Sequence, residues 1–449
     1  MKKSNYIYAL VTILAFGSCK KFLAVDPRDA ISDELTIVDK ASAQTAVRGI
    51  YRSLSSDGYY GNSFQSIGYL SGDNIQWTGS QSIVQQFISH NVRPENATVA
   101  SVWQAIYSTI NRANHVISKL PEVIDPSLTQ AERNQLLGEA YLIRALSYFD
   151  LARTWGGVQI ILTPTLSATD KDGIKRSTAA ETYAQVLADL TTAEPLLAIP
   201  TAQNPIRANR ETVWALRSRY HLYQKEWTLA ESYATKVITN TVNYQLLKPY
   251  ASFFSPASAV ATRESVFELS YSATYTNGHR GQWQPPANGG TRQIAPNDAF
   301  IALVNNPAIG GNRSSSVAKT SAGLWYGNFY YRSPATDPAY IIRIAELYLI
   351  RSEARAQQNK LPESLTDLNA VRDRAGLPVS TAISQADILL AIENERRLEF
   401  AFEPHRWFDL VRTGRVAAVL GLTNANSHVL PVPANELSID KSLDQNPGY

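Results

Sequence analysis

Residues 138–157 read G-E-A-Y-L-I-R-A-L-S-Y-F-D-L-A-R-T-W-G-G, and this stretch decides the fold class of the chain. Apolar and aromatic side chains recur in it every three or four residues, as at Tyr141, Ala145 and Tyr148. That interval is the period of an amphipathic α-helix. The sequence therefore predicts one long helix, which ends at the Gly156-Gly157 pair.

Similar periodic segments occur in pairs along the rest of the chain. Thr129 with Glu132, and Thr178 with Glu181, match the capping boxes that begin helices. Within 178–239, small and aromatic residues alternate across short helices in a way that resembles a tetratricopeptide repeat. We expect helical pairs over about 97–155, 178–239 and 340–375, and a further helix over 39–54. The predicted fold class is mainly α, a tetratricopeptide-like helical-repeat scaffold with long irregular loops and a few short strands.

Two loop regions, at about 58–93 and 249–336, interrupt the helical pattern and are rich in Gly, Asn, Ser, Pro and aromatic residues. Alternation over 267–271 suggests a strand in the second region. The rings in these regions are Tyr59, Tyr60, Trp77, Trp283, Trp325, Tyr326, Tyr330 and Tyr331. They could pack the loops onto the helices, or they could form a sugar-binding surface, because the apolar face of a pyranose stacks on a flat ring. Since the loops contain too few Leu, Ile and Val residues to bury eight rings, we expect the whole set to form a surface platform. Tyr60, Trp283, Trp325 and Tyr326 are predicted ligand-binding members of it.

Composition excludes several classes of protein. The chain has 449 residues, a net charge of +3 and no run of Lys or Arg longer than two, so nucleic acid is not an expected partner. It contains one cysteine, which permits neither an internal disulfide nor a cysteine-based zinc site.

That cysteine, Cys19, follows the plan of an export signal. Lys2-Lys3 precede an apolar stretch over 6–16, and the small pair Gly17-Ser18 comes directly before Cys19. In bacteria this order is similar to a lipobox, in which the cysteine becomes the acylated first residue. We expect a signal peptide at 1–18, a lipidated tether at 19–38, and a single domain at 39–449 held on a membrane by several acyl chains.

Recognisable catalytic and metal-binding motifs are largely absent from the sequence. No G-x-S-x-G, P-loop or G-x-G-x-x-G motif occurs, and the six histidines are at least 23 positions apart, so we expect neither a cofactor nor a metal. A pair of glycosidase carboxylates stays open. In the charged cluster at 393–412, a catalytic interpretation would set Glu395 or Glu399 beside His405. We favour ion pairs that lock helices together.

At this cluster the chain resembles a known family. E-R-R-L-E-F-A-F-E-P-H-R-W-F-D-L-V-R-T-G, residues 395–414, resembles the C-terminal signature of the RagB/SusD family of outer-membrane nutrient-binding lipoproteins of Bacteroidetes. The segments 138–157 and 340–356 are similar to family helices, and the tail L-P-V-P-A-N-E-L followed by D-Q-N-P-G-Y is similar to the family's chain end. Pro404 departs from the commoner Gly. The C-terminal signature of the predicted domain is taken as 393–449.

The resemblance implies a cell-surface lipoprotein that captures a polymer and acts as a lid on a SusC-like TonB-dependent β-barrel. It implies glycan uptake without chemistry, or peptide uptake as in some members. Within Gly72-Asp73-Asn74-Ile75-Gln76-Trp77, the position of Trp77 resembles a ligand-loop aromatic of the family, and Asp73 and Asn74 are predicted beside it. Trp283, Trp325 and Tyr326 are candidates from composition. A surface glycoside hydrolase or lyase, and a purely scaffolding subunit, are the other hypotheses.

Overall fold

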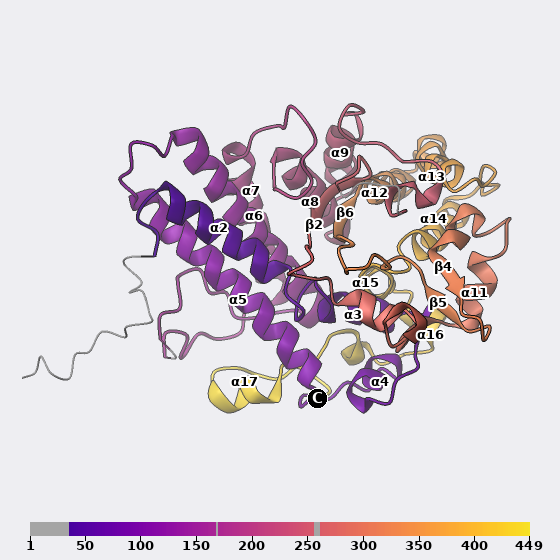
Figure 1. The fold of residues 1–449 in the computed structure, drawn as a ribbon, viewed down its shortest axis with the longest axis horizontal. Helices are drawn as coiled ribbons and strands as arrows, with labels where there is room; N and C mark the ends of the chain where they lie inside the picture. The colour runs from indigo at the N-terminus through magenta and orange to yellow at the C-terminus, as the bar shows by residue number, and fades with distance from the viewer. Residues whose placement is uncertain (1–35, 168, 256–260) are drawn as a thin grey trace, which may run out of the picture.

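The computed structural model describes residues 36–167, 169–255 and 261–449, which form a mainly helical body (Figure 1). The helices are α2 (Lys40–Leu54), α3 (Ser63–Leu70), α4 (Ser82–Ile88), α5 (Ala97–Lys119), α6 (Gln130–Trp155), α7 (Ala179–Leu196), α8 (Arg210–Tyr223), α9 (Trp227–Ile238), α10 (His279–Trp283), α11 (Asp298–Val304), α12 (Ile344–Gln357), α13 (Leu361–Arg374), α14 (Gln385–Glu399), α15 (Arg406–Arg412), α16 (Val416–Leu420) and α17 (Ala434–Ile439). Short 3₁₀ segments lie at Leu120–Glu122, Tyr250–Phe253, Pro286–Asn288, Gly311–Ser316 and Ala425–His428. The mainly α fold class is confirmed.

The longer helices form an array in which each helix contacts the next. Helices α2, α5, α6 and α7 lie side by side at one end of the molecule, and α8, α9, α12 and α13 continue the array (Figure 1). At the start of α6, Thr129 Oγ1 accepts from the Glu132 amide, and Glu132 Oε2 accepts from the Thr129 amide at 3.1 Å, which is the predicted capping box. At its end Gly156 has a φ of 77°, a conformation that side chains with a Cβ rarely adopt.

Six short strands form three antiparallel pairs. The strands are β1 (Ile75–Trp77), β2 (Ser265–Leu269), β3 (Ile294–Pro296), β4 (Val317–Lys319), β5 (Trp325–Gly327) and β6 (Ala339–Arg343), paired as β1–β3, β2–β6 and β4–β5. The strand predicted at 267–271 overlaps β2, which begins and ends two residues earlier. Residues 341–343 (Ile-Ile-Arg) were expected to be helical and instead belong to β6, because a short segment with two adjacent isoleucines fits a buried strand as well as a helix.

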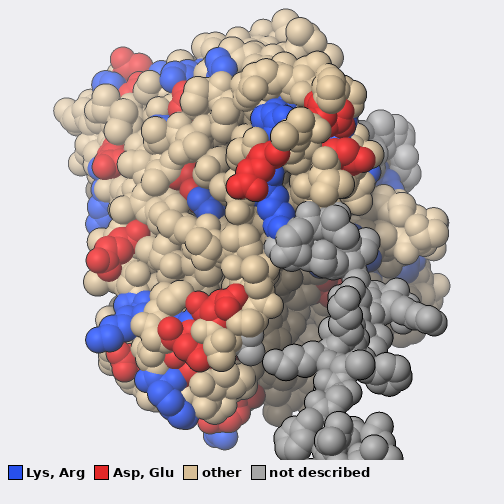
Figure 2. Space-filling model, turned by 90° about the vertical axis from the view of Figure 1, so that its left-hand side faces the viewer, with Lys and Arg blue, Asp and Glu red and all other residues tan. Residues whose placement is uncertain are grey.

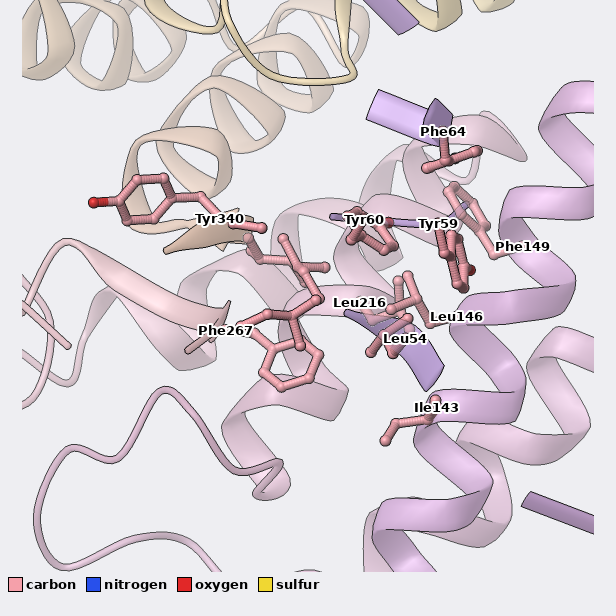
Figure 3. Close-up of a cluster of buried hydrophobic side chains, with 14 of the residues drawn as sticks. Leu54, Tyr59, Tyr60, Phe64, Ile143, Leu146, Phe149, Leu216, Phe267 and Tyr340 are labelled. Atoms are coloured by element: carbon pink, nitrogen blue, oxygen red, sulfur yellow. The ribbon is translucent and has the colours of Figure 1, made fainter. Parts of the chain in front are cut away.

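The largest core cluster joins the first loop region to the helices (Figure 3). Tyr59 and Tyr60 lie among Leu54, Phe64 and Phe149, and both rings are fully enclosed. Their hydroxyls donate to the same carboxylate oxygen of Asp150 on α6, at 2.7 and 2.9 Å. A buried Tyr keeps its hydroxyl satisfied in this way, so the two rings fix the loop after α2 to α6.

Buried ion pairs hold the C-terminal elements together. Glu399 is completely buried at the end of α14 and accepts from Arg343 at 2.7 Å, from Arg313 at 2.9 Å and from Arg374. Arg412 on α15 makes a two-pronged contact with Glu353 on α12 at 2.6 and 2.8 Å. The ion-pair interpretation of the 393–412 cluster is therefore confirmed by its geometry.

Candidate functional site

The expectation that all eight loop rings form a surface platform is wrong. Tyr60 and Trp283 are each only 1% exposed, and Tyr59 and Tyr330 are buried as well. The loops need few aliphatic residues of their own, because distant elements supply the partners. The Trp283 ring lies 5.3 Å from Tyr69 and 5.0 Å from Phe402, both outside its own loop.

Asp73 and Asn74 hold the first loop onto the C-terminal signature. Asn74 is buried, its amide nitrogen donates to the Arg397 carbonyl at 3.0 Å, and its oxygen accepts from Arg397 Nε at 2.7 Å. Asp73 accepts from Arg406 Nε at 2.6 Å and lies 3.1 Å from Arg397. Burial alone would raise the pKa of Asp73, but Arg406 and Arg397 hold it below its usual value. The side chains of Asp73 and Asn74 therefore both make their contacts within the protein.

Trp77, Trp325 and Tyr326 are the predicted ligand rings that stay partly exposed, and the strands bring them to one part of the molecule. Trp77 ends β1 and pairs in register with Ile294 of β3, and β5, which begins with Trp325, also contacts β3. Arg292, just before β3, connects the two tryptophans: its Nε donates to the Trp325 carbonyl at 2.8 Å, and its own carbonyl accepts from Thr78, the residue after Trp77, at 2.5 Å.

Lys319 completes this group from the neighbouring hairpin. It is exposed, it pairs in register with Trp325 across β4–β5, and its Nζ lies 4.4 Å from the centroid of the Trp325 ring. This is cation–π geometry. We call the set Trp77, Arg292, Lys319, Trp325 and Tyr326 the aromatic edge.

Sequence reasoning identified the rings of the aromatic edge but missed its two cations. Burial lowers the pKa of the Arg292 guanidinium, and no carboxylate among the described residues offsets this effect. The signal that could have indicated them is the absence of Asp and Glu from 299–336, the segment that carries Lys319 and Trp325.

The catalytic interpretation of the C-terminal cluster finds no geometric support. Glu395 and Glu399 are both bound by Arg313, at 2.5 and 2.9 Å. The His405 ring lies tilted against Phe400, with ring centroids 4.6 Å apart, and burial, together with neighbouring guanidinium groups, lowers its pKa well below the ordinary range. A general base needs reach to a substrate proton, and these side chains are enclosed by cations and rings.

A separate cavity of about 340 Å³ lies between α5 and α17. Its polar groups are largely used internally: Tyr107 donates to the Gln159 carbonyl at 2.8 Å, and Lys171 pairs with Glu436 at 3.4 Å. In the ranges that the structure describes, three or more His, Cys, Asp or Glu side chains nowhere gather as a metal site would require.

The membrane-related features of the sequence fall largely beyond the structure. Cys19, the predicted lipidation site, and the predicted signal peptide lie outside the described residues. Among the helices from residue 36 onward that the structure describes, none combines the length and apolar character of a membrane span.

Two family models match the chain. One is described as "SusD family" and matches residues 325–449, and the other is described as "Starch-binding associating with outer membrane" and matches residues 21–222. The first of these ranges includes Lys319's partner Trp325, and the second includes Trp77.

Proteins described as SusD-like are similar to this chain over most of its length. A SusD-like protein of Formosa agariphila is 26% identical over 98% of this chain and 97% of its own, and one of Bacteroides ovatus is 22% identical over 91% and 82%. A SusD superfamily protein of Bacteroides thetaiotaomicron has the same fold, with a TM-score of 0.80, 24% identity, and coverage of 91% of this chain and 100% of that chain. A laminarin-binding SusD-like protein also has a TM-score of 0.80, at 23% identity, with coverage of 92% and 100%. The two matched models, these relatives and the shared fold agree with the resemblance of the C-terminal signature, and all of them relate the chain to the SusD/RagB family.

Proposed function

We propose that this protein captures polysaccharide or oligosaccharide at the aromatic edge and delivers it to a SusC-like TonB-dependent transporter, for which it acts as a lid. The observation that carries the proposal is the grouping of Trp77 and Trp325 around Arg292, with both rings partly exposed. Stacked rings bind the apolar faces of sugars, and the polar groups between them bind hydroxyls. The family description as starch-binding, and the laminarin-binding relative of the same fold, support a glycan as cargo.

The proposed activity is binding without catalysis. The carboxylates of the C-terminal cluster are held in ion pairs, and the family names describe binding proteins. Stacking on a few partly exposed rings gives modest affinity for one short oligosaccharide. A long polymer that engages several proteins on one surface gains by multivalency.

The proposed location is the cell surface, with lipid on Cys19 anchoring the protein in the outer membrane. The family description as associated with the outer membrane supports this location. Cys19→Ser removes the acylated thiol. We expect that variant to leave the membrane fraction, while Ser118→Ala, an exposed position on α5, stays with the membrane. Equal membrane retention of the Cys19→Ser variant would contradict lipid anchoring.

The experiment that tests the cargo is isothermal titration of the purified protein with starch, laminarin, an acidic polysaccharide and an oligopeptide mixture. Saturable binding of at least one polysaccharide is the expected result. Heat from the peptides alone would contradict glycan capture and favour the peptide-uptake hypothesis.

The transporter is tested separately, by affinity purification of the lipidated protein from outer membranes. Recovery of a TonB-dependent barrel in stoichiometric amounts is expected. Binding of glycan without recovery of any barrel would contradict the lid.

A further inference from the structure

The cations of the aromatic edge have no carboxylate partners among the described residues. Arg292 and Lys319 make no ion pair there, and the same holds for Arg280 on the adjoining helix α10. Of the other three cations of the second loop region, Arg313 pairs with two glutamates and Arg332 pairs with Asp337 at 2.8 Å, whereas Arg263 donates to Gln245 and to the Thr241 carbonyl and makes no ion pair among the described residues. Three of the four cations of this region that make no ion pair among the described residues therefore lie at or beside the aromatic edge.

The sequence around the edge supplies no acid that could pair with them. Asp and Glu are absent from 74–94, 269–297 and 299–336, the three segments that build the edge. The acids that flank the strands, Asp73 and Asp298, both lie at the Ile75/Pro296 end of the β1–β3 pair, and Trp77 and Arg292 lie at the opposite end.

This distribution differs from that of the helical scaffold. On the face that corresponds to the left-hand side of Figure 1, positive and negative side chains alternate over the surface (Figure 2). Many cations of the scaffold have acidic neighbours, as Arg351 and Arg355 have in Asp367. Such ion pairs recur through the scaffold, and none of them reaches the described cations of the aromatic edge.

Arg292 in particular is poised to accept an anion. Its Nε donates a hydrogen bond to the Trp325 carbonyl, and its terminal nitrogens make no hydrogen bond to the described residues. A partly desolvated guanidinium without a counter-charge is unfavourable, and a carboxylate or sulfate that binds its remaining N–H groups removes that penalty. Lys319, over the Trp325 ring, can contact a second anionic group of a ligand stacked beside that ring.

We propose that the aromatic edge binds anionic glycans, polysaccharides that carry carboxylate or sulfate groups, with Trp77 and Trp325 stacking on sugar rings while Arg292 and Lys319 bind the anions. The inference rests on the proposed glycan-binding function and names the class of its cargo. An acidic peptide would satisfy the cations but not the stacking surface, so it is treated as an outcome of the test.

The test is isothermal titration of the purified protein with four probes: polygalacturonate, a sulfated galactan, neutral laminarin and poly-glutamate. We expect one of the two anionic glycans to bind about tenfold more tightly than laminarin in 50 mM salt, and to lose much of this advantage in 500 mM salt. Polygalacturonate and the sulfated galactan distinguish carboxylate from sulfate as the recognised group.

Single substitutions test whether the cations of the aromatic edge cause the preference for anionic glycans. Lys319→Gln should weaken binding of the preferred anionic glycan about two- to fivefold, and Arg292→Gln about tenfold. Lys236 gives a matched control, because it is also exposed and its Nζ also lies 4.4 Å from a ring centroid, that of Tyr233 on the distant helix α9. Lys236→Gln should leave affinity unchanged. Since Arg292 also bonds to the Trp325 backbone, Lys319→Gln is the variant least able to act through folding.

The outcomes separate this inference from the proposed function. Laminarin bound as tightly as both anionic glycans would overturn the anionic specificity and leave glycan capture standing. Poly-glutamate bound as tightly as the anionic glycans would overturn recognition of a sugar. Equal losses in the Lys319 and Lys236 variants would overturn the assignment to the aromatic edge, and no binding of any glycan would remove the proposed function as well.

Discussion

Replacing Glu399 with Gln removes the carboxylate on which three arginines converge. The side chain is fully buried, and Arg313, Arg343 and Arg374 all donate to it. Burial by itself raises its pKa, but the three guanidinium groups lower it from 4.5 to about 2. Since a tenfold change in acidity corresponds to 1.36 kcal/mol, the ionised form contributes about 3 kcal/mol to stability. Breaking a buried ion pair by removing one partner costs a similar 3–5 kcal/mol.

The assay is urea unfolding of wild type and Glu399→Gln at several pH values. A carboxylate with a lowered pKa in the folded state stabilises the protein above pH 4.5, and this contribution disappears as the pH falls toward 2. We therefore expect the variant to be about 3 kcal/mol less stable at pH 7, with a difference that shrinks toward pH 2. Glu122→Gln, an exposed position, should change stability by less than about 0.5 kcal/mol. A Glu399→Gln loss below about 1 kcal/mol, or one independent of pH, would refute the reasoning.

Two further predictions concern buried side chains near the loops. Burial raises the pKa of Glu268 to about 7, so its stabilising contribution is complete below pH 4.5 and is lost as the pH rises through 7. As the pH rises from 5 to 8, the free energy of unfolding of Glu268→Gln, measured with urea, should therefore increase by about 3 kcal/mol relative to that of wild type. A difference that stays constant over this range would contradict the prediction. Tyr60→Phe removes one of the two hydroxyls that donate to Asp150 and should cost about 1 kcal/mol, because Tyr59 and Arg153 still satisfy the carboxylate. Its polysaccharide affinity should be unchanged, and a weakened affinity would return Tyr60 to the binding site.

The helices could be predicted from sequence because their signals are local. The three-and-four spacing of residues 138–157 and the Thr129/Glu132 capping box are complete within a few turns of chain. Ile341, Ile342 and Arg343 were ambiguous for the same reason, since only pairing with β2, far away in sequence, makes them a strand. Local patterns do not carry that information.

The candidate site could be predicted only in part, because its contacts are non-local. Composition identified the loop aromatics, but burial separates them into core and surface, and that depends on partners such as Phe402 for Trp283. The proximity of Trp77 and Trp325 depends on β3 contacting both of their strands, with Arg292 bridging them. The ion pairs of the C-terminal cluster were predicted as a type of interaction, but their partners Arg313 and Arg343 come from other segments.

The central claim is that the partly exposed rings of the aromatic edge bind polysaccharide. The most direct measurement is the affinity of a Trp77→Leu/Trp325→Leu double variant for the polysaccharide that wild type binds, determined by isothermal titration after unfolding curves confirm that both proteins are folded. Trp227→Leu is the matched control, since Trp227 is also partly buried but begins the distant helix α9. With about 0.5–1.5 kcal/mol for each stacked ring, the double variant should bind about tenfold more weakly while the Trp227 variant is unchanged. A folded double variant with wild-type affinity would contradict the placement of the binding site at the aromatic edge.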